Sequence, residues 1–271
     1  MKKGMFQRLT MLAVIVMASM TAYAQGGTAT TIDAGKSVGE TFDYRGLKYK
    51  ILDNASGYTV EVVGFEDNLV ANPDLFDTSE DLVQNTVAIP HYIGSGSGVA
   101  VNVYVSGVAE NAFQTVDADL AAKATKMTID YVDNDKTAGV PITIGENAFA
   151  GLTSLTEVKS FTPGAKVAAI PDNAFATAIY KKPLIVPEGK MGKYAATEGW
   201  KKFNIIKTED GQILGNMNTD ARLTTGDYTL LLTMIKTRPL PNPIPDYADM
   251  NGDGRLTTGD AAILLDIVKR R

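Results

Sequence analysis

Cysteine is absent from this chain of 271 residues, and histidine and tryptophan each occur once. Without cysteine the chain forms no disulfide, no thiolate zinc site and no lipid anchor attached through a thiol. The single histidine, His91, excludes multi-histidine zinc sites, and a Ser-His-Asp triad would depend on it alone. His91 stands in "PHYIGSGSG", which contains no nucleophile elbow. We therefore interpret it as a histidine at the end of a strand.

Long apolar runs are also missing, and no segment is apolar over the ~20 residues that span a bilayer. The short run "MLAVIVMA" follows three cations and precedes "AYA", which together are typical of a secretory signal peptide over residues 1–24. An uncleaved membrane anchor is the alternative. We predict cleavage before Gln25 and an exported protein (secreted, on the cell surface or periplasmic) without a transmembrane segment after cleavage.

The charge of the chain is negative, with a formal net charge of −5 at pH 7. Removing residues 1–24, which hold three cations and no acid, brings the net charge to −8 (−5 − 3). Lys and Arg are scattered, which argues against nucleic acid as a partner. Acidic residues are too numerous for counting to exclude a glycosidase-type carboxylate pair, but no spacing singles one out.

The middle of the chain has several short segments with the alternation of β-strands, after a polar start at residues 25–40 that we expect to be mobile. Three related strings, "VAENAF", "IGENAF" and "IPDNAF", end at Phe113, Phe149 and Phe175, with spacings of 36 and 26 residues. The second spacing fits leucine-rich repeats, and the first needs an insertion, for which the polar residues 130–139 are the candidate. We predict that the three phenylalanines are buried equivalents in stacked coils.

These strings resemble the BspA-like leucine-rich repeat family of bacterial surface proteins. The resemblance rests on "ITIGENAFAGLTSLTEVKSF", "AAIPDNAF" and a closing "PLIVPEGKMGKYAATEGWKKFNIIK", and it spans about residues 40–207. It implies a solenoid that binds a ligand which the sequence does not identify. The repeats are few and irregular, which argues against a large concave binding face. Trp200 is therefore expected to pack in the last coil.

The stretch "DMNGDGRLTTGD", from Asp249 to Asp260, has the oxygen spacing of an EF-hand calcium loop. Counting Asp249 as position 1, the predicted ligands at positions 1, 3, 5, 7, 9 and 12 are Asp249, Asn251, Asp253, Arg255 (through its carbonyl), Thr257 and Asp260. Gly254 provides the tight turn at position 6, and Leu256 at position 8 is expected to point inward. The alternative is a surface turn that is merely rich in Asp and Gly.

A related copy, "NMNTDARLTTGD", begins 33 residues earlier at Asn216. Its predicted ligands are Asn216, Asn218, Asp220, Arg222, Thr224 and Asp227. Asn216 replaces an Asp and leaves two carboxylates instead of three, and ligand charge sets affinity. Ala221 replaces the Gly at position 6, where a positive φ costs roughly 1 kcal/mol. We therefore expect two Ca²⁺ sites, with the Asp249–Asp260 loop binding more tightly.

Each loop precedes a helical pattern, and each has Asp at position 12, where EF-hand loops usually have Glu. One loop followed by one helix, written twice with 11 of 20 positions identical, resembles the type I dockerin family over about residues 213–271. The resemblance implies a cohesin-like protein partner, with recognition positions at Thr225, Gly226, Thr258 and Gly259. Because both copies carry this pair, either half is a candidate for docking. Alternatively, these residues only start the helices.

These patterns together predict a mainly β solenoid, a short and irregular leucine-rich repeat, at residues 41–207. A linker at 208–214 then leads to a small α-helical domain with two EF-hand-like calcium loops at 215–271. The predicted function is non-catalytic: an exported binding or adhesion protein with a calcium-dependent, dockerin-like docking module. The alternatives are an accessory component of a polysaccharide-degrading assembly tethered to a cohesin, and a calcium module that is only a stabilising cap.

Overall fold

The computed structural model describes residues 32–71, 85–94, 100–131, 141–163, 166–220 and 222–270. The predicted signal peptide, Ala221 and most of the predicted insertion at residues 130–139 lie outside these ranges. Of the polar start, the described part begins at Ile32, which is buried and whose carbonyl accepts a hydrogen bond from the Ala100 N–H (3.0 Å).

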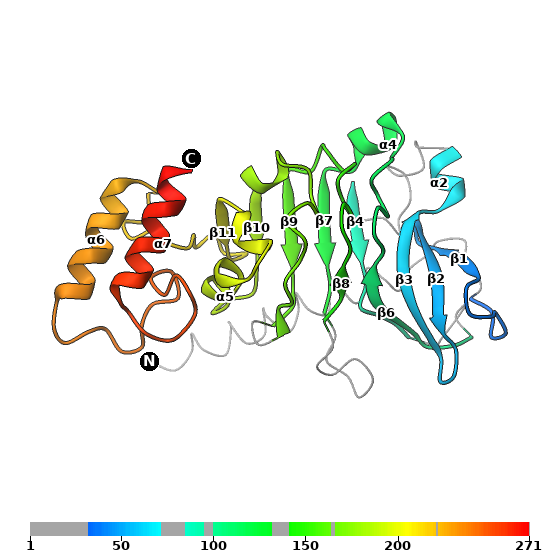
Figure 1. Cartoon of the computed structure of the whole chain (residues 1–271), viewed down its shortest axis with the longest axis horizontal. Helices are drawn as coiled ribbons and strands as arrows, with labels where there is room; N and C mark the ends of the chain where they lie inside the picture. The colour runs from blue at the N-terminus through cyan, green and yellow to red at the C-terminus, as the bar shows by residue number, and fades with distance from the viewer. Residues whose placement is uncertain are drawn as a thin grey trace, which may run out of the picture.

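The first sheet has six strands and is built around an antiparallel meander (Figure 1). In sheet order its strands are β1 (Thr41–Tyr44), β2 (Leu47–Asp53), β3 (Tyr58–Phe65), β6 (Val103–Val108) and β5 (Tyr92–Ile93), and β8 (Thr143–Ile144) also pairs with β6. Strands β1 to β3 are antiparallel, whereas β3 and β6 are parallel. Tyr58, Val60 and Val62 are buried at alternate positions of β3, as a strand with one face in the core requires.

The second sheet has five strands, all parallel. In sheet order they are β11 (Ile205–Lys207), β10 (Pro183–Ile185), β9 (Glu157–Ser160), β7 (Lys126–Ile129) and β4 (Thr86–Ile89). One register row crosses the whole sheet and is buried throughout; it consists of Val87, Met127, Val158, Leu184 and Ile206. Apolar residues in register thus fix one face of this sheet to the core.

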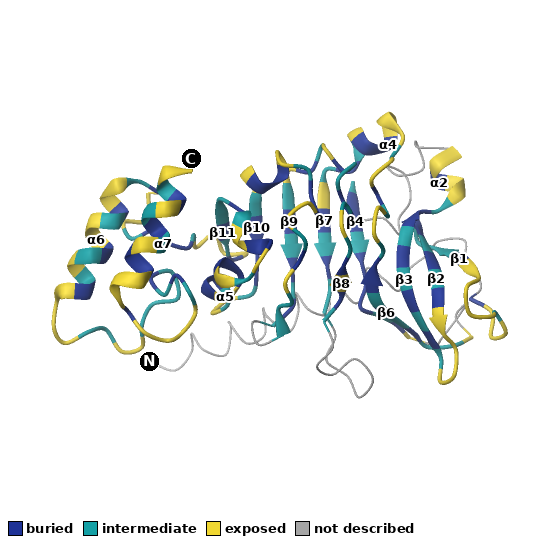
Figure 2. Ribbon diagram, in the orientation of Figure 1, coloured by how far each residue is buried: buried dark blue, intermediate teal, exposed yellow. Residues whose placement is uncertain are grey.

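A row of aromatic rings runs through the core from one end of the sheets towards the other. The ring centroids of Phe113 and Phe149 lie 5.9 Å apart, and those of Phe149 and Phe175 lie 5.0 Å apart. The row continues from Phe175 to Phe203 at 5.6 Å. The predicted burial of the three repeated phenylalanines is confirmed, since their exposed fractions are 0, 0 and 3%. Figure 2 shows that buried residues occur along the strands of both sheets.

Five short α-helices are present in the described residues, three among the strands and two after the last strand. They are α2 (Asp67–Ala71), α4 (Ala118–Lys123), α5 (Met191–Ala196), α6 (Thr225–Lys236) and α7 (Thr258–Lys269), with 3-10 turns η2 (Ile179–Lys181) and η3 (Trp200–Lys202). None of them is long and apolar enough to cross a membrane, among the residues that were described.

The predicted fold class is wrong. The structure is a mixed α/β fold with two multi-stranded sheets, one of them all parallel, and not a mainly β solenoid followed by a helical domain with EF-hand-like loops. The chain alternates between the two sheets: β6 and β8 belong to the first sheet, and β7 and β9 belong to the second. The pairing of strands that are far apart in the chain, such as β3 with β6, and the helices of five and six residues follow no repeat period, and therefore the repeat pattern did not predict them.

Residues 208–270, called the tail below, pack against the end of residues 32–207, called the body. The Leu214 N–H donates to the Ile206 carbonyl (2.9 Å), and Ile213 forms an antiparallel bridge with Lys207. Helix α7 lies between α6 and the body (Figure 1). Leu231 of α6 and Leu264 of α7 belong to the same hydrophobic cluster as the core of the body. The predicted domain boundaries at residues 207 and 214 remain predictions.

Candidate metal-binding loops

The second loop, Asp249–Asp260, is held by hydrogen bonds from its own backbone to its side chains. The Asp249 carboxylate accepts the N–H groups of Asp253 (3.2 Å) and Gly254 (2.8 Å). Asn251 accepts the Asp253 N–H (3.1 Å), and Asp253 accepts the Arg255 N–H (2.8 Å). The predicted ligands at positions 1, 3 and 5 therefore surround one turn of backbone. Gly254 has a φ of +76°, which glycine adopts without strain.

The first loop, Asn216–Asp227, repeats this pattern over its described residues. Asn218 accepts the Asp220 N–H (3.2 Å), and Asp220 accepts the Arg222 N–H (2.9 Å). The Asn218 amide also donates to the Asp220 carboxylate (2.9 Å), as Asn251 does to Asp253 (3.0 Å). The two loops therefore join the amide nitrogen of position 3 to the carboxylate of position 5 in the same way.

The aspartate at position 12 closes each loop. Asp260 accepts the N–H groups of Met250 (3.0 Å) and Thr257 (2.8 Å) and the Thr257 hydroxyl (3.1 Å). Asp227 accepts the equivalent groups of Met217 (2.9 Å) and Thr224 (2.8 and 3.0 Å). Both carboxylates are completely buried. Each one ties the start of its loop to the start of its helix, where Thr and Asp form a capping box.

Position 1 distinguishes the two loops. Asn216 in the first loop is only 9% exposed, and its side-chain oxygen has no hydrogen-bond partner. Its counterpart Asp249 bonds two backbone N–H groups with its carboxylate. A buried carbonyl oxygen without a partner is costly and is rare in folded proteins. A cation in the first loop would satisfy it, which supports a metal at this position.

The donor types of both loops fit a hard cation such as Ca²⁺, because all the predicted ligands are oxygens. Among the described residues, however, no group of three or more His, Cys, Asp or Glu side chains is gathered as a metal cluster. The carboxylates bond backbone N–H groups instead. Cation binding would require Asn251 and Asp253, which are hydrogen-bonded to each other, to turn their oxygens towards the ion.

The four predicted recognition residues all lie on the surface at the first turns of α6 and α7: Thr225, Gly226, Thr258 and Gly259 are exposed. The preceding threonines, Thr224 and Thr257, are the helix caps, and their hydroxyls accept the Gly226 and Gly259 N–H groups (3.1 Å each). Capping therefore does not explain Thr225 and Thr258. The inward orientation predicted for Leu256 agrees with its exposed fraction of 5%.

The structure also brings the second loop against α5 of the body, which the sequence analysis missed. A Cβ atom built on Gly192 would lie 2.2 Å from the Asp249 carbonyl oxygen and 2.5 Å from the Gly252 nitrogen. Nearby, the Gly189 N–H donates to the Asp246 carboxylate (3.1 Å), and burial raises the pKa of Asp246. Gly192 is 57 residues from Asp249 (249 − 192), and therefore no local pattern could indicate this contact.

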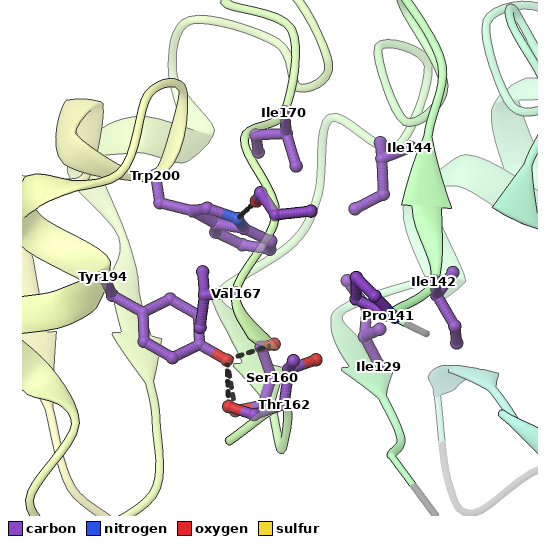
Figure 3. A pocket seen from close by; sticks show the side chains of 11 residues that line it. Ile129, Pro141, Ile142, Ile144, Ser160, Thr162, Val167, Ile170, Tyr194 and Trp200 are labelled. Carbon is purple, nitrogen blue, oxygen red and sulfur yellow. Dashed lines mark hydrogen bonds between the residues drawn. The ribbon is translucent and has the colours of Figure 1, made fainter. Parts of the chain in front are cut away.

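A small pocket in the body lies beside Tyr194 and Trp200 (Figure 3). The Tyr194 hydroxyl is hydrogen-bonded to the Ser160 hydroxyl (2.7 Å) and donates towards the Thr162 carbonyl (2.9 Å). Burial raises the pKa of Tyr194 to about 12. The cavity has a volume of about 10 Å³, which is the space of a single water. Trp200 is 4% exposed and donates to the Ala168 carbonyl (3.0 Å), so it is packed as predicted.

The single histidine of the chain is likewise a packed residue. His91 stands between β4 and β5, is 2% exposed and stacks on Tyr131 with ring centroids 4.9 Å apart.

Comparison of the chain with family models, curated proteins and solved structures found no match. The functional argument therefore depends on the geometry of the tail.

Proposed function

We propose that this chain is an exported, non-catalytic binding protein whose tail binds two calcium ions and docks on a protein partner. The observation that carries the proposal is the duplicated loop. In both copies the side chains of positions 3 and 5 are hydrogen-bonded to each other, and a buried aspartate at position 12 closes the loop. A surface turn that is merely polar has no need for a buried carboxylate or for a second copy.

The two calcium sites are expected to differ in affinity. The second loop has three carboxylates, Asp249, Asp253 and Asp260, whereas the first has Asp220 and Asp227. Because affinity rises with ligand charge, the second loop should bind more tightly. The orphaned oxygen of Asn216 supports metal binding in the first loop as well. Cation binding at both loops would order the first turns of α6 and α7, where the recognition residues lie.

The proposed partner is a cohesin-like protein, as the resemblance of the tail to type I dockerins implies. Exposed Thr hydroxyls donate to a partner, and the adjacent Gly residues allow its backbone to come close. Export is supported by the charged start, the apolar run and "AYA". The ligand of the body is not identified by any feature of the described residues.

Isothermal titration of the full chain with CaCl₂ after EDTA treatment tests the metal sites. We expect two unequal sites, with the tighter one weakened by Asp249→Asn. Two equal sites, or no binding heat, would contradict the proposal.

Docking is tested by capture of secreted host proteins on the full chain, with calcium and with EDTA. Calcium-dependent capture that is lost in the double variant Thr225→Glu and Thr258→Glu supports docking, and its absence assigns a structural role to the tail.

A further inference from the structure

The contact between the second loop and α5 is made by backbone on both sides. A Cβ atom on Gly192 would lie within 2.5 Å of atoms of the second loop, and a Cβ atom on Gly252 would lie 2.7 Å from the Lys193 nitrogen. Gly252, at position 4 of the loop, has a φ of +65°. A contact this close tolerates little change in the backbone on either side. Docking of the tail on α5 therefore depends on the conformation of the second loop.

The same region concentrates negative charge. The second loop contributes three carboxylates; Asp246 and Glu188 are nearby, as are the cations Lys190 and Lys193. Burial raises the pKa of Asp246, and the negative charges of Asp249 and Glu188 raise it further. Like charges brought together disfavour the contact, and a divalent cation among them would relieve the repulsion.

Among the described glycines of the body, Gly192 approaches the second loop and none approaches the first. Helix α6, which follows the first loop, lies on the far side of α7 from the body (Figure 1). The two loops are therefore alike in local geometry but differ in whether the body depends on them.

We propose that the second loop is a metal-dependent joint: Ca²⁺ bound between Asp249 and Asp260 locks the tail onto α5, and this couples the stability of the body to calcium. The inference rests on the proposed calcium binding and adds that one site, not both, controls the connection. By linkage, docking of the tail raises the calcium affinity of the second loop by the same factor by which calcium favours docking.

The single tryptophan of the chain makes the proposal measurable. Trp200 lies in the body on η3, and its ring is in edge contact with Tyr194 of α5, with centroids 5.5 Å apart. Its fluorescence therefore reports unfolding of the body beside the joint, and no residue of the tail contributes tryptophan signal. Calcium at ~100 times its dissociation constant should raise the unfolding temperature reported by Trp200 by roughly 5–10 °C for a chain of this size.

The experiment compares thermal unfolding of the full chain in EDTA and in excess CaCl₂ for three variants. Asp249→Asn gives the second loop the residue that the first loop has at position 1. Asp220→Asn is the matched control, because it removes one carboxylate from the first loop. Gly192→Ala disturbs the contact without altering a ligand. Calcium binding by each variant is measured in parallel by calorimetry.

We expect the calcium-induced shift to persist in Asp220→Asn and to be reduced in Asp249→Asn when calcium is held at the concentration that just saturates the second loop of the unmodified chain. In Gly192→Ala it should be lost while calorimetry still detects calcium binding. If Gly192→Ala does not fold, the comparison of Asp249→Asn with Asp220→Asn decides whether the second loop is the joint. A shift that is lost in Asp220→Asn but kept in Asp249→Asn overturns the joint. Calcium binding at the second loop without any shift in the unfolding temperature also overturns the joint, but it leaves the proposed calcium sites standing. Absence of both binding and shift refutes both proposals.

Discussion

The two loops of the tail have almost the same local structure and different surroundings. In each, a buried aspartate accepts two backbone N–H groups and a threonine hydroxyl, with corresponding distances that differ by 0.1 Å or less. Yet only the second loop rests on α5, and only the first has a buried oxygen without a partner, at Asn216. Local sequence thus determines how each loop closes, whereas the surrounding structure determines what depends on it.

The largest expected effect tests the similarity of the two loops. Asp260→Ala and Asp227→Ala each remove a completely buried carboxylate and leave several hydrogen-bond donors without an acceptor. We expect each to lower the free energy of unfolding of the tail by roughly 3 kcal/mol or more, since hydrogen bonds to charged groups are strong. Urea unfolding in EDTA, followed by circular dichroism, measures this without metal.

The matched control for this pair is Asp266→Ala, which removes an exposed carboxylate of α7 that pairs with Arg270 (3.2 Å). Exposed ion pairs contribute at most about 1 kcal/mol. If one of the two buried aspartates tolerates substitution as well as Asp266 does, the loops do not close in the same way.

The next effect tests the difference between the loops. Gly192→Ala should cost about 1–3 kcal/mol, because the added methyl group would overlap the backbone of the second loop. The measurement is thermal unfolding followed by Trp200 fluorescence. Gly211→Ala is the control, because its Cβ would meet nothing within 4 Å, although its φ of +91° adds some strain. Equal losses in both variants would show that the contact with α5 is looser than described.

A smaller effect is expected at the two helix caps. Thr224→Ala and Thr257→Ala each remove a hydroxyl that accepts a backbone N–H at 3.1 Å. Each should cost ~1 kcal/mol. The two losses should be equal in EDTA, because the capping geometry is the same in both halves. Unequal losses, measured by urea unfolding, would extend the difference between the halves from the surroundings to the helix starts.

The smallest effect concerns position 6 of the second loop. Gly254→Ala places at this position the residue that the first loop has there, and no atom lies within 4 Å of the new methyl group. The cost should therefore be the conformational one alone, up to about 1 kcal/mol for a φ of +76°. Calcium titration of this variant should also show a weaker second site. A loss of unfolding free energy larger than that of Gly192→Ala would show that the positive φ is not the only cost at this position.

Sequence patterns predicted those parts of the molecule whose interactions are local. Alternating strands such as β3 and the helices after each loop follow from periodicity, and Phe113, Phe149 and Phe175 are buried as their repetition indicates. Leu223 and Leu256 point inward because position 8 of each loop is apolar in an otherwise polar stretch. The calcium ligands, the partner and export remain predictions that await measurement.

The fold class was predicted incorrectly because it depends on pairings between distant strands. Strand β3 pairs directly with β6 in parallel, with Tyr58 opposite Val103, although β4 of the other sheet and β5 lie between them in the chain. Periodicity shows which face of a strand is buried but not which strand lies beside it. Helices as short as α2 and α4 complete fewer than two turns, and therefore leave little periodic signal.

Local sequence specifies the chemistry of the tail: two sets of oxygens at fixed spacing and two capped helices, within segments short enough for neighbouring residues to set their geometry. The burial of Asp227 and Asp260 and the unequal surroundings of the two sets arise from tertiary packing. The contact of Gly192 with Asp249 and Gly252 joins residues that are far apart along the chain. Such a contact depends on how the body ends and where α7 packs, and no local propensity encodes that arrangement.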